Sequence, residues 1–452
     1  MDVNSSFGGH FGVAVRDITP PIGINSRNWG AAAFDQAIGV HQPLLMHGLH
    51  FSSANERLVL LTADLGWWKN AEDEDKIRKK LLRYFDLAES ELIFALSHTH
   101  AGPSISSADV ELPGGKLIPP YLDSIAKHAI QCIEEAINNQ FEGQMNWTYG
   151  VCDLACNRDL ESGKDFLIGF NPLGVADNTL LVGQIFDSDS RLRTVICNYA
   201  CHPTSFGHEN KLISPDFVGE MRSTVEKATG VPCVFLQGAS GDLAPKKQYV
   251  SDPAVVEANG RQLGYAVLST LEQAFKPDRT WVFDKALSSG APLACWKESE
   301  AEVSALIQSR VVNIQVPYKK LPSLESILDE YHNCQDRVLK ERLWRKYNTR
   351  KSIGANQNAT LSVWLWRLGN AIVVAQANEA YSVFQMAVRA AFPNRCLVFI
   401  NIANGYLGYL PPKDLYDKEV YAVWQSPYDK GSLEILIEYT KIEIAKLLTH
   451  EA

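Results

Sequence analysis

The feature that most constrains this chain is a repeated alternation of short apolar runs with longer amphipathic stretches. The run RLVLLTADLG at residues 57–66 is typical of a buried strand, and residues 72–85 after it are acidic first and basic later, the order that a helix dipole favours. The same alternation predicts strands at 92–96, 231–237, 370–377 and 396–403, a hairpin over 180–200, and helices at 119–138, 214–230 and about 379–392. The pattern indicates an α/β chain with mixed sheets.

Polar or glycine-rich segments follow five of these strands. His98 follows the second strand, His202 follows the hairpin, and the segment GASGDLAP follows residues 231–237. Glu379 and Tyr409 lie just beyond the last two strands. Because ligands of open α/β sheets bind outside the carboxyl ends of the strands, we expect one shared site there.

The segment SHTHAGP places His98 and His100 two positions apart. Residues at this spacing in an extended segment point to the same face, as a metal ligand beside a base requires. The alternative is a polar strand end whose rings bond to the backbone. Two imidazoles, a carboxylate and an oxygen donor suit zinc, but spacing alone does not select Glu379 among 52 acidic residues or Tyr409 among 16 tyrosines.

The composition excludes some classes of protein. The formal net charge of −9 argues against nucleic-acid binding. No run approaches the ~18 apolar residues of a membrane span, and the N-terminus lacks the basic and apolar regions of a signal peptide. Nine scattered cysteines without CxxC spacing predict reduced, buried thiols and a cytoplasmic location.

We expect residues 1–452 to form a single domain. Residues 290–350 differ from the rest, because they are strongly charged and include a long helical stretch over 324–350. We interpret 290–350 as an accessory insertion or a lid, with a solvated amphipathic helix as the simpler reading.

Seven segments, in this order, resemble the neutral (non-lysosomal) ceramidase family. They are RDITPPIG, SHTHAGP, CNRDL, NYACHPTS, FLQGASGDLAP, ANEAYS and NGYLGYLPP, and they span about residues 10 to 430. The resemblance implies layered mixed β-sheets flanked by helices, as a catalytic domain without the family's immunoglobulin-like C-terminal domain. It implies hydrolysis of a linear, ceramide-like N-acyl amide by metal-activated water.

The resemblance also implies one Zn²⁺ per chain, held by His98, His202, Glu379 and Tyr409. For Glu379, asparagine replaces the glycine of the family's segment, and a preference for a helix N-terminus is the alternative. A strand-ending role is the alternative for His202.

Three further residues receive roles from the resemblance. His100 would be a general acid/base or an oxyanion partner, Arg158 would bind or orient the substrate, and Tyr421 would stabilise the oxyanion. Arg158 as an exposed loop residue and Tyr421 as packing are the alternatives.

One departure from the family pattern keeps other functions open. Many ceramidases have a serine where this chain has Ala244, so an acyl-enzyme cannot form at that position. The alternatives are a serine hydrolase that uses Ser240, a metal-binding homologue without catalysis, and a zinc hydrolase of a small soluble amide or ester.

Overall fold

The centre of the molecule is a large mixed sheet. The computed structural model describes residues 5–449 except 55, 164 and 355. The eight strands of this sheet are, in spatial order, β13 (Cys233–Gln237), β11 (Leu192–Tyr199), β10 (Thr179–Asp187), β6 (Phe141–Val151), β1 (Phe7–Asp17), β3 (Leu45–Ser53), β4 (Glu56–Ala63) and β5 (Leu92–Leu96). The β11–β13 and β4–β5 pairs at the two edges are parallel, and the pairs between them are antiparallel.

Helices cover one face of this sheet. They are α1 (Ala71–Phe85) and α2 (Ile118–Asn138) beside β1, β3 and β4, and α3 (Phe217–Thr229) and α4 (Pro253–Glu272) beside β10, β11 and β13. Ile125 and Ile133 share the buried stripe of α2, as the 3.6-residue period predicts. Asp216 caps the start of α3, and Gly230, at φ +73°, ends it.

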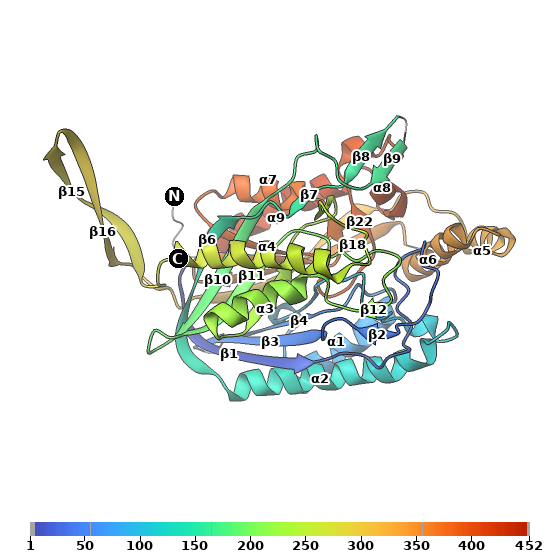
Figure 1. Ribbon diagram of the computed structural model, residues 1–452, viewed down its shortest axis with the longest axis horizontal. Helices are drawn as coiled ribbons and strands as arrows, with labels where there is room; N and C mark the ends of the chain where they lie inside the picture. Colours follow the sequence, from blue (N-terminus) through green and yellow to red (C-terminus); the bar gives the residue numbers. More distant parts are fainter. Residues whose placement is uncertain (1–4, 55, 164, 355, 450–452) are drawn as a thin grey trace.

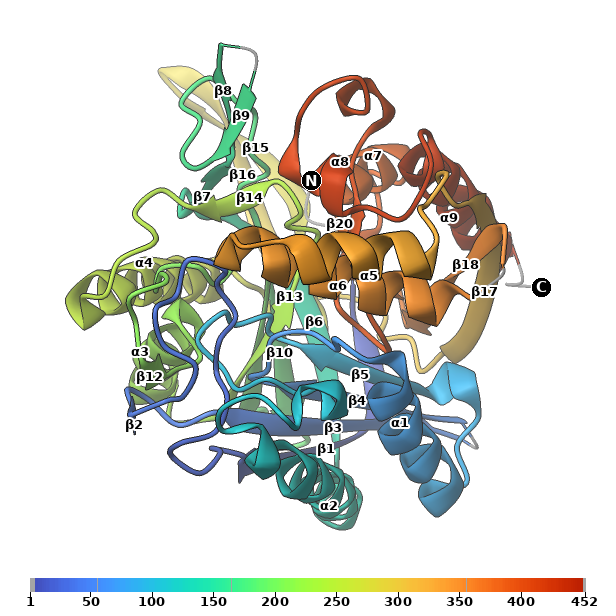
Figure 2. The ribbon, with the colours of Figure 1, turned by 90° about the vertical axis from the view of Figure 1, so that its right-hand side faces the viewer.

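A second sheet packs on the other face of the first. Its strands are β17 (Ile307–Pro317), β18 (Asn358–Leu368), β19 (Ala371–Gln376) and β21 (Cys396–Ile400). Trp364 and Trp366 of β18 lie in the core between the two sheets, and α7 (Val383–Ala391) and α9 (Ser432–Thr449) cover the far side of the second sheet. The predicted layered mixed sheets flanked by helices are therefore confirmed (Figure 1 and Figure 2).

The segment after β21 joins opposite edges of the eight-stranded sheet. The Leu96 amide at the end of β5 donates to the Ile402 carbonyl at 3.0 Å, and the Asn401 amide donates to Gln237 of β13 at 2.8 Å. Residues 401–404 thereby bring the carboxyl ends of β5, β13 and β21 to one place. This convergence, rather than one open parallel sheet, assembles the strand ends that the sequence singles out.

Two predicted helices differ from the structure. The helix expected from Glu379 begins at Val383, because Glu379 lies in β20 (Glu379–Ala380), which pairs with β22 (Tyr409–Leu410). The long helix expected over 324–350 is two helices, α5 (Leu324–Asn333) and α6 (Arg337–Ile353). The break occurs where the Asp336 side chain accepts a hydrogen bond from the Leu339 amide at 2.7 Å and caps α6.

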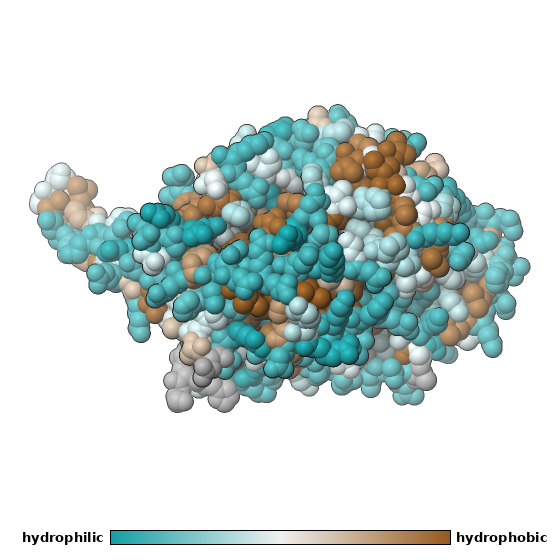
Figure 3. Space-filling view, turned by 90° about the horizontal axis from the view of Figure 1, so that it is seen from below, coloured by the Kyte–Doolittle hydropathy of each residue, from teal (hydrophilic) through white to brown (hydrophobic). Residues whose placement is uncertain are grey.

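The segment expected as an accessory insertion, residues 290–350, has parts at both ends of the molecule. β16 (Ala291–Glu300) pairs with β15 (Arg279–Ser289), which precedes that segment, in a two-stranded ribbon, here called the arm, which projects from one end, whereas α5 and α6 lie at the other (Figure 1). β17 connects them as a strand of the second sheet. Figure 3 shows apolar surface on the arm. The remaining elements are short: β2 (Gly39–Val40), β7 (Ala155–Asn157), β8 (Asp159–Ser162), β9 (Asp165–Ile168), β12 (Leu212–Ile213), β14 (Leu243–Pro245), α8 (Tyr421–Gln425), and 3-10 turns at Glu89–Glu91, Ser107–Asp109, Gly115–Leu117 and Lys413–Leu415.

Two general expectations can be compared with the described residues. None of their helices combines the length and the apolar character that a membrane crossing requires. All nine cysteines are free thiols, and six of them are buried.

Candidate metal centre

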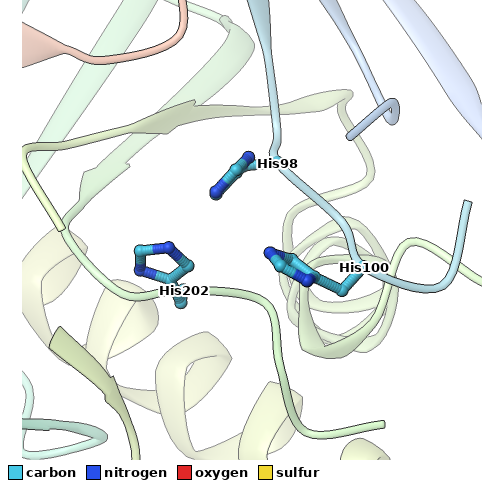
Figure 4. Close-up of side chains that lie close together, drawn as sticks. All are labelled: His98, His100 and His202. Atoms are coloured by element: carbon cyan, nitrogen blue, oxygen red, sulfur yellow. The ribbon is translucent and has the colours of Figure 1, made fainter. Parts of the chain in front are cut away.

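Three histidines meet at the convergent strand ends. His98, His100 and His202 each offer a ring nitrogen, and these atoms all lie within 4.8 Å of one another. Figure 4 shows the three rings turned toward a common space from two separate segments of the chain. The cluster could hold a metal ion.

The local backbone around His98 differs from the expected extended strand. His98 lies two residues beyond the end of β5 and has a φ of +69°, in the left-handed region that non-glycine residues rarely adopt. The same-face argument for His98 and His100 is therefore wrong. Their rings still lie with centroids 5.0 Å apart, because the chain turns between them and the His100 amide donates to the Pro203 carbonyl at 3.3 Å.

The imidazoles of His98 and His202 are oriented by backbone carbonyls. His202 Nδ1 donates to Ser240 O at 2.6 Å, and His98 Nδ1 donates to Gly66 O at 3.1 Å. Since a carbonyl only accepts, the proton sits on Nδ1 and the Nε2 lone pair is free to bind a metal.

The Glu379 carboxylate faces both Nε2 atoms. Its Oε2 lies 2.7 Å from His202 Nε2 and 3.2 Å from His98 Nε2. Burial, followed by the positive charge of Arg158, lowers the pKa of His202 to about 4, so this ring is neutral at ordinary pH. Burial opposes ionisation of Glu379, but the two histidines outweigh it, and its pKa lies well below the ordinary value. The carboxylate oxygen and the two imidazole nitrogens that face it form a set of ligand atoms that suits a cation.

Two tyrosines complete the surroundings of Glu379. Tyr409 lies opposite Glu379 in the β20–β22 pair, and its hydroxyl is 3.5 Å from His202 Nε2. Tyr406, which is not among the residues expected at the site, donates from its hydroxyl to Glu379 Oε1 at 2.8 Å. Tyr406 is the first tyrosine of the quoted segment NGYLGYLPP, so a signal for it was present in the sequence.

Arg158 lies behind Tyr409 and is buried. Its Nη2 donates to the Tyr409 hydroxyl at 3.0 Å and to Gly241 O at 2.9 Å. Because the guanidinium donates, the Tyr409 oxygen accepts this hydrogen bond. A direct contact of Arg158 with substrate stays a prediction.

His100 and Tyr421 flank the cluster without joining the Glu379 contacts. Both ring nitrogens of His100 are buried and have no hydrogen-bond partner among the described residues. Burial, then the neighbouring charges of His98 and His202, lower its pKa well below the ordinary value. The Tyr421 ring lies 5.8 Å from that of Tyr409. Both residues line the adjacent cavity.

The two candidate serine positions lack the geometry of a nucleophile. The Ser240 hydroxyl accepts a hydrogen bond from Gln237 Nε2 at 2.6 Å, and His202 meets the carbonyl of Ser240 rather than its hydroxyl. Ala244 is buried in β14 opposite Cys156. Neither position has the serine–histidine contact that an activated serine needs.

A cavity of about 560 Å³ opens beside the histidines. His98, His100 and Glu379 line it, together with side chains of α5 and α6 such as Tyr331 and Trp344. The volume is typical of small-molecule sites, which hold roughly 300–1,000 Å³.

The fold has known counterparts among solved structures. A crystal structure of neutral ceramidase from Pseudomonas aeruginosa is 18% identical and aligns over 98% of this chain and 74% of its own, with a TM-score of 0.70. A structure described as ceramidase complexed with C2 is 17% identical and aligns over 98% and 75%, with a TM-score of 0.69. This chain has the neutral ceramidase fold. The resemblance seen in the sequence segments is thus confirmed at the level of the fold.

No protein-family model matches the sequence. The neutral ceramidase fold of the chain therefore rests on the structural likeness. At 18% identity, that likeness does not assign a substrate or the roles of individual residues.

Proposed function

We propose that this protein is a zinc-dependent hydrolase of linear amides. The observation that carries the proposal is the meeting of the His98 and His202 Nε2 atoms with one carboxylate oxygen of Glu379, at 3.2 and 2.7 Å. The two imidazoles, the Glu379 carboxylate and the Tyr409 oxygen would hold one Zn²⁺ per chain. Bound there, zinc would acidify a water molecule and polarise the amide carbonyl.

The surrounding side chains supply the other functions of an amidase. His100 is suited to move a proton between water and the leaving amine, because its buried nitrogens are free of protein partners among the described residues. Tyr421 would donate from its hydroxyl to the developing oxyanion. Arg158 would hold the Tyr409 oxygen in place through its 3.0 Å hydrogen bond.

α5 and α6 act as a cover over the cavity in this proposal. Trp344 and Arg345 of α6 line the cavity together with His98 and His100. A cover of this kind excludes water from the reaction and strengthens the electrostatic interactions inside. The whole chain would then work as one catalytic domain.

The test is a metal analysis joined to an activity measurement. Elemental mass spectrometry of the purified protein should give about one zinc per chain, and a chelator should remove both the zinc and the hydrolysis of an N-acyl amide panel that includes ceramides. Added zinc should restore both.

Three outcomes would contradict the proposal. Protein that takes up no zinc when it is offered lacks the proposed site. Turnover that survives the chelator and is blocked by a fluorophosphonate probe indicates a serine hydrolase. Zinc binding without turnover of any amide or ester indicates a metal-binding homologue.

A further inference from the structure

The cavity beside the histidines is rich in charge. Five cationic side chains line it: Arg27, Lys69, Arg337, Lys340 and Arg345. Some are neutralised by carboxylates, since Arg27 lies 3.0 Å from Glu341 and Arg337 lies 3.2 Å from Asp35. Because buried charge is costly without partners, this wall favours a polar occupant.

Two of these cations lie over the same aromatic ring. Lys69 Nζ is 5.4 Å from the centre of the Trp67 ring, and Arg345 Cζ is 5.7 Å from it. Burial lowers the pKa of Lys69; the charge of Asp109 opposes this lowering, and the charge of Arg345 adds to it. An anion beside both cations would relieve their repulsion.

Both cations retain donors for a ligand. Among the described residues, the Lys69 ammonium donates one hydrogen bond, to the Ser104 hydroxyl at 3.2 Å, and Asp109 Oδ2 lies farther away at 3.8 Å. Arg345 uses Nη2 for the Asn28 carbonyl and for Glu341. An ammonium has three donors and a guanidinium has five, so each side chain can still bind a carboxylate.

Trp67 connects these cations to the histidines. The ring centroid of Trp67 lies 5.0 Å from that of His100 and 5.6 Å from that of His98. A ligand that reaches from the imidazoles to Lys69 therefore needs only to cross one indole ring.

Resting on the proposed amide hydrolysis, we propose that the substrate is a short linear amide that carries a carboxylate, which Lys69 and Arg345 bind. The scissile amide then lies at the histidines, with Trp67 along its length. A ceramide fits this wall poorly, because its two long hydrocarbon chains would lie against charged groups.

The test uses two matched pairs of amides. N-hexanoyl-β-alanine and N-propylsuccinamic acid carry the carboxylate on the amine side and the acyl side, and N-hexanoylpropylamine and N-propylbutanamide are their neutral counterparts. In at least one pair, we expect the acid to have a kcat/KM about ten- to hundredfold higher than its neutral counterpart. Its Kd for the chelator-treated protein should be lower by about the same factor. The pair with the larger preference identifies the side that carries the carboxylate.

The variants Lys69→Met and Arg345→Met should each reduce that preference about tenfold or more, while binding of the neutral amide shows that they fold. Lys351→Met is the matched control, because Lys351 is an exposed cation of α6 outside the cavity lining. Equal kcat/KM for acid and neutral amides, or a preference that survives both variants, would overturn the inference about the carboxylate. Either result would leave the proposed amide hydrolysis in place. Selective binding of the acids without cleavage would support the inference and contradict the proposed function.

Discussion

The arm and the α5–α6 pair come from neighbouring parts of the sequence but lie at opposite ends of the molecule (Figure 1). Both contain tryptophan and alternating charge. In the arm, Trp296 is exposed, whereas Trp344 of α6 lines the cavity beside the metal centre. Similar aromatic and charged composition thus does not assign a role by itself, because β17 carries the chain across the molecule between the two settings.

The largest effect is expected at the metal centre beside α5 and α6, when a histidine is removed. His98→Ala should abolish zinc binding and lower turnover by at least about a thousandfold, because the metal supplies several kcal/mol to the transition state. His10→Ala, at an exposed histidine of β1, is the control, and metal content with steady-state kinetics is the measurement.

His100→Ala sharpens this prediction. The variant should keep its zinc and lose turnover if Glu379 and Tyr409 complete the ligand set. Loss of zinc would instead assign His100 as a ligand with His98 and His202.

The next largest effect should be on stability. Asp64 and Arg222 form a fully buried ion pair at the end of β4, in which Arg222 Nη1 donates to Asp64 Oδ1 at 2.9 Å. Asp64→Ala should lower the free energy of unfolding by about 3–5 kcal/mol, because it leaves a buried guanidinium unpaired. Denaturant titration measures this, and a change below about 1 kcal/mol would contradict it.

A smaller effect is expected behind the metal centre. Arg158→Met removes the hydrogen bond to the Tyr409 hydroxyl and should weaken zinc binding or turnover by about 10–100-fold. Competition with a zinc chelator measures the affinity. Unchanged affinity with a raised KM would instead support the direct substrate contact that the resemblance implies.

The smallest effect is expected on the arm. Asp284 lies 2.7 Å from Lys297, but the lysine side chain is 61% exposed. Asp284→Ala should change the free energy of unfolding by about 1 kcal/mol or less, because water screens the pair. A loss as large as that of Asp64→Ala would show that the arm contributes to stability as strongly as the buried core does.

Local signals in the sequence predict the elements that local physics decides. The strand at residues 92–96 and the helix that Asp216 and Gly230 delimit agree with the structure, because burial pattern and capping act within a few residues. The expectation that a helix begins at Glu379 is wrong, because Glu379 pairs in a strand with Tyr409, 30 residues later in the sequence. Such a pairing leaves no periodic signal.

The site was predictable to a similar degree. The residues at strand ends converge as expected, although the φ of His98 and the role of residues 401–404 depend on tertiary contacts. Lys69 and Arg345 meet over Trp67 only because α6 folds over the cavity. No spacing in the chain connects these residues.

Residues 401–404, which join the two edges of the eight-stranded sheet, also limit when the N-terminal strands can finish folding. The Asn404 side chain accepts a hydrogen bond from the Phe94 amide across 310 positions of sequence, and Tyr421 follows later still. During synthesis, most of the chain must emerge before residues 401–404 can cover the outer edge of β5, so folding has a high contact order and is expected to be slow. A ribosome-bound chain that ends before residue 400 would therefore leave β5 as a free edge, open to chaperones and to aggregation, and would carry no complete site.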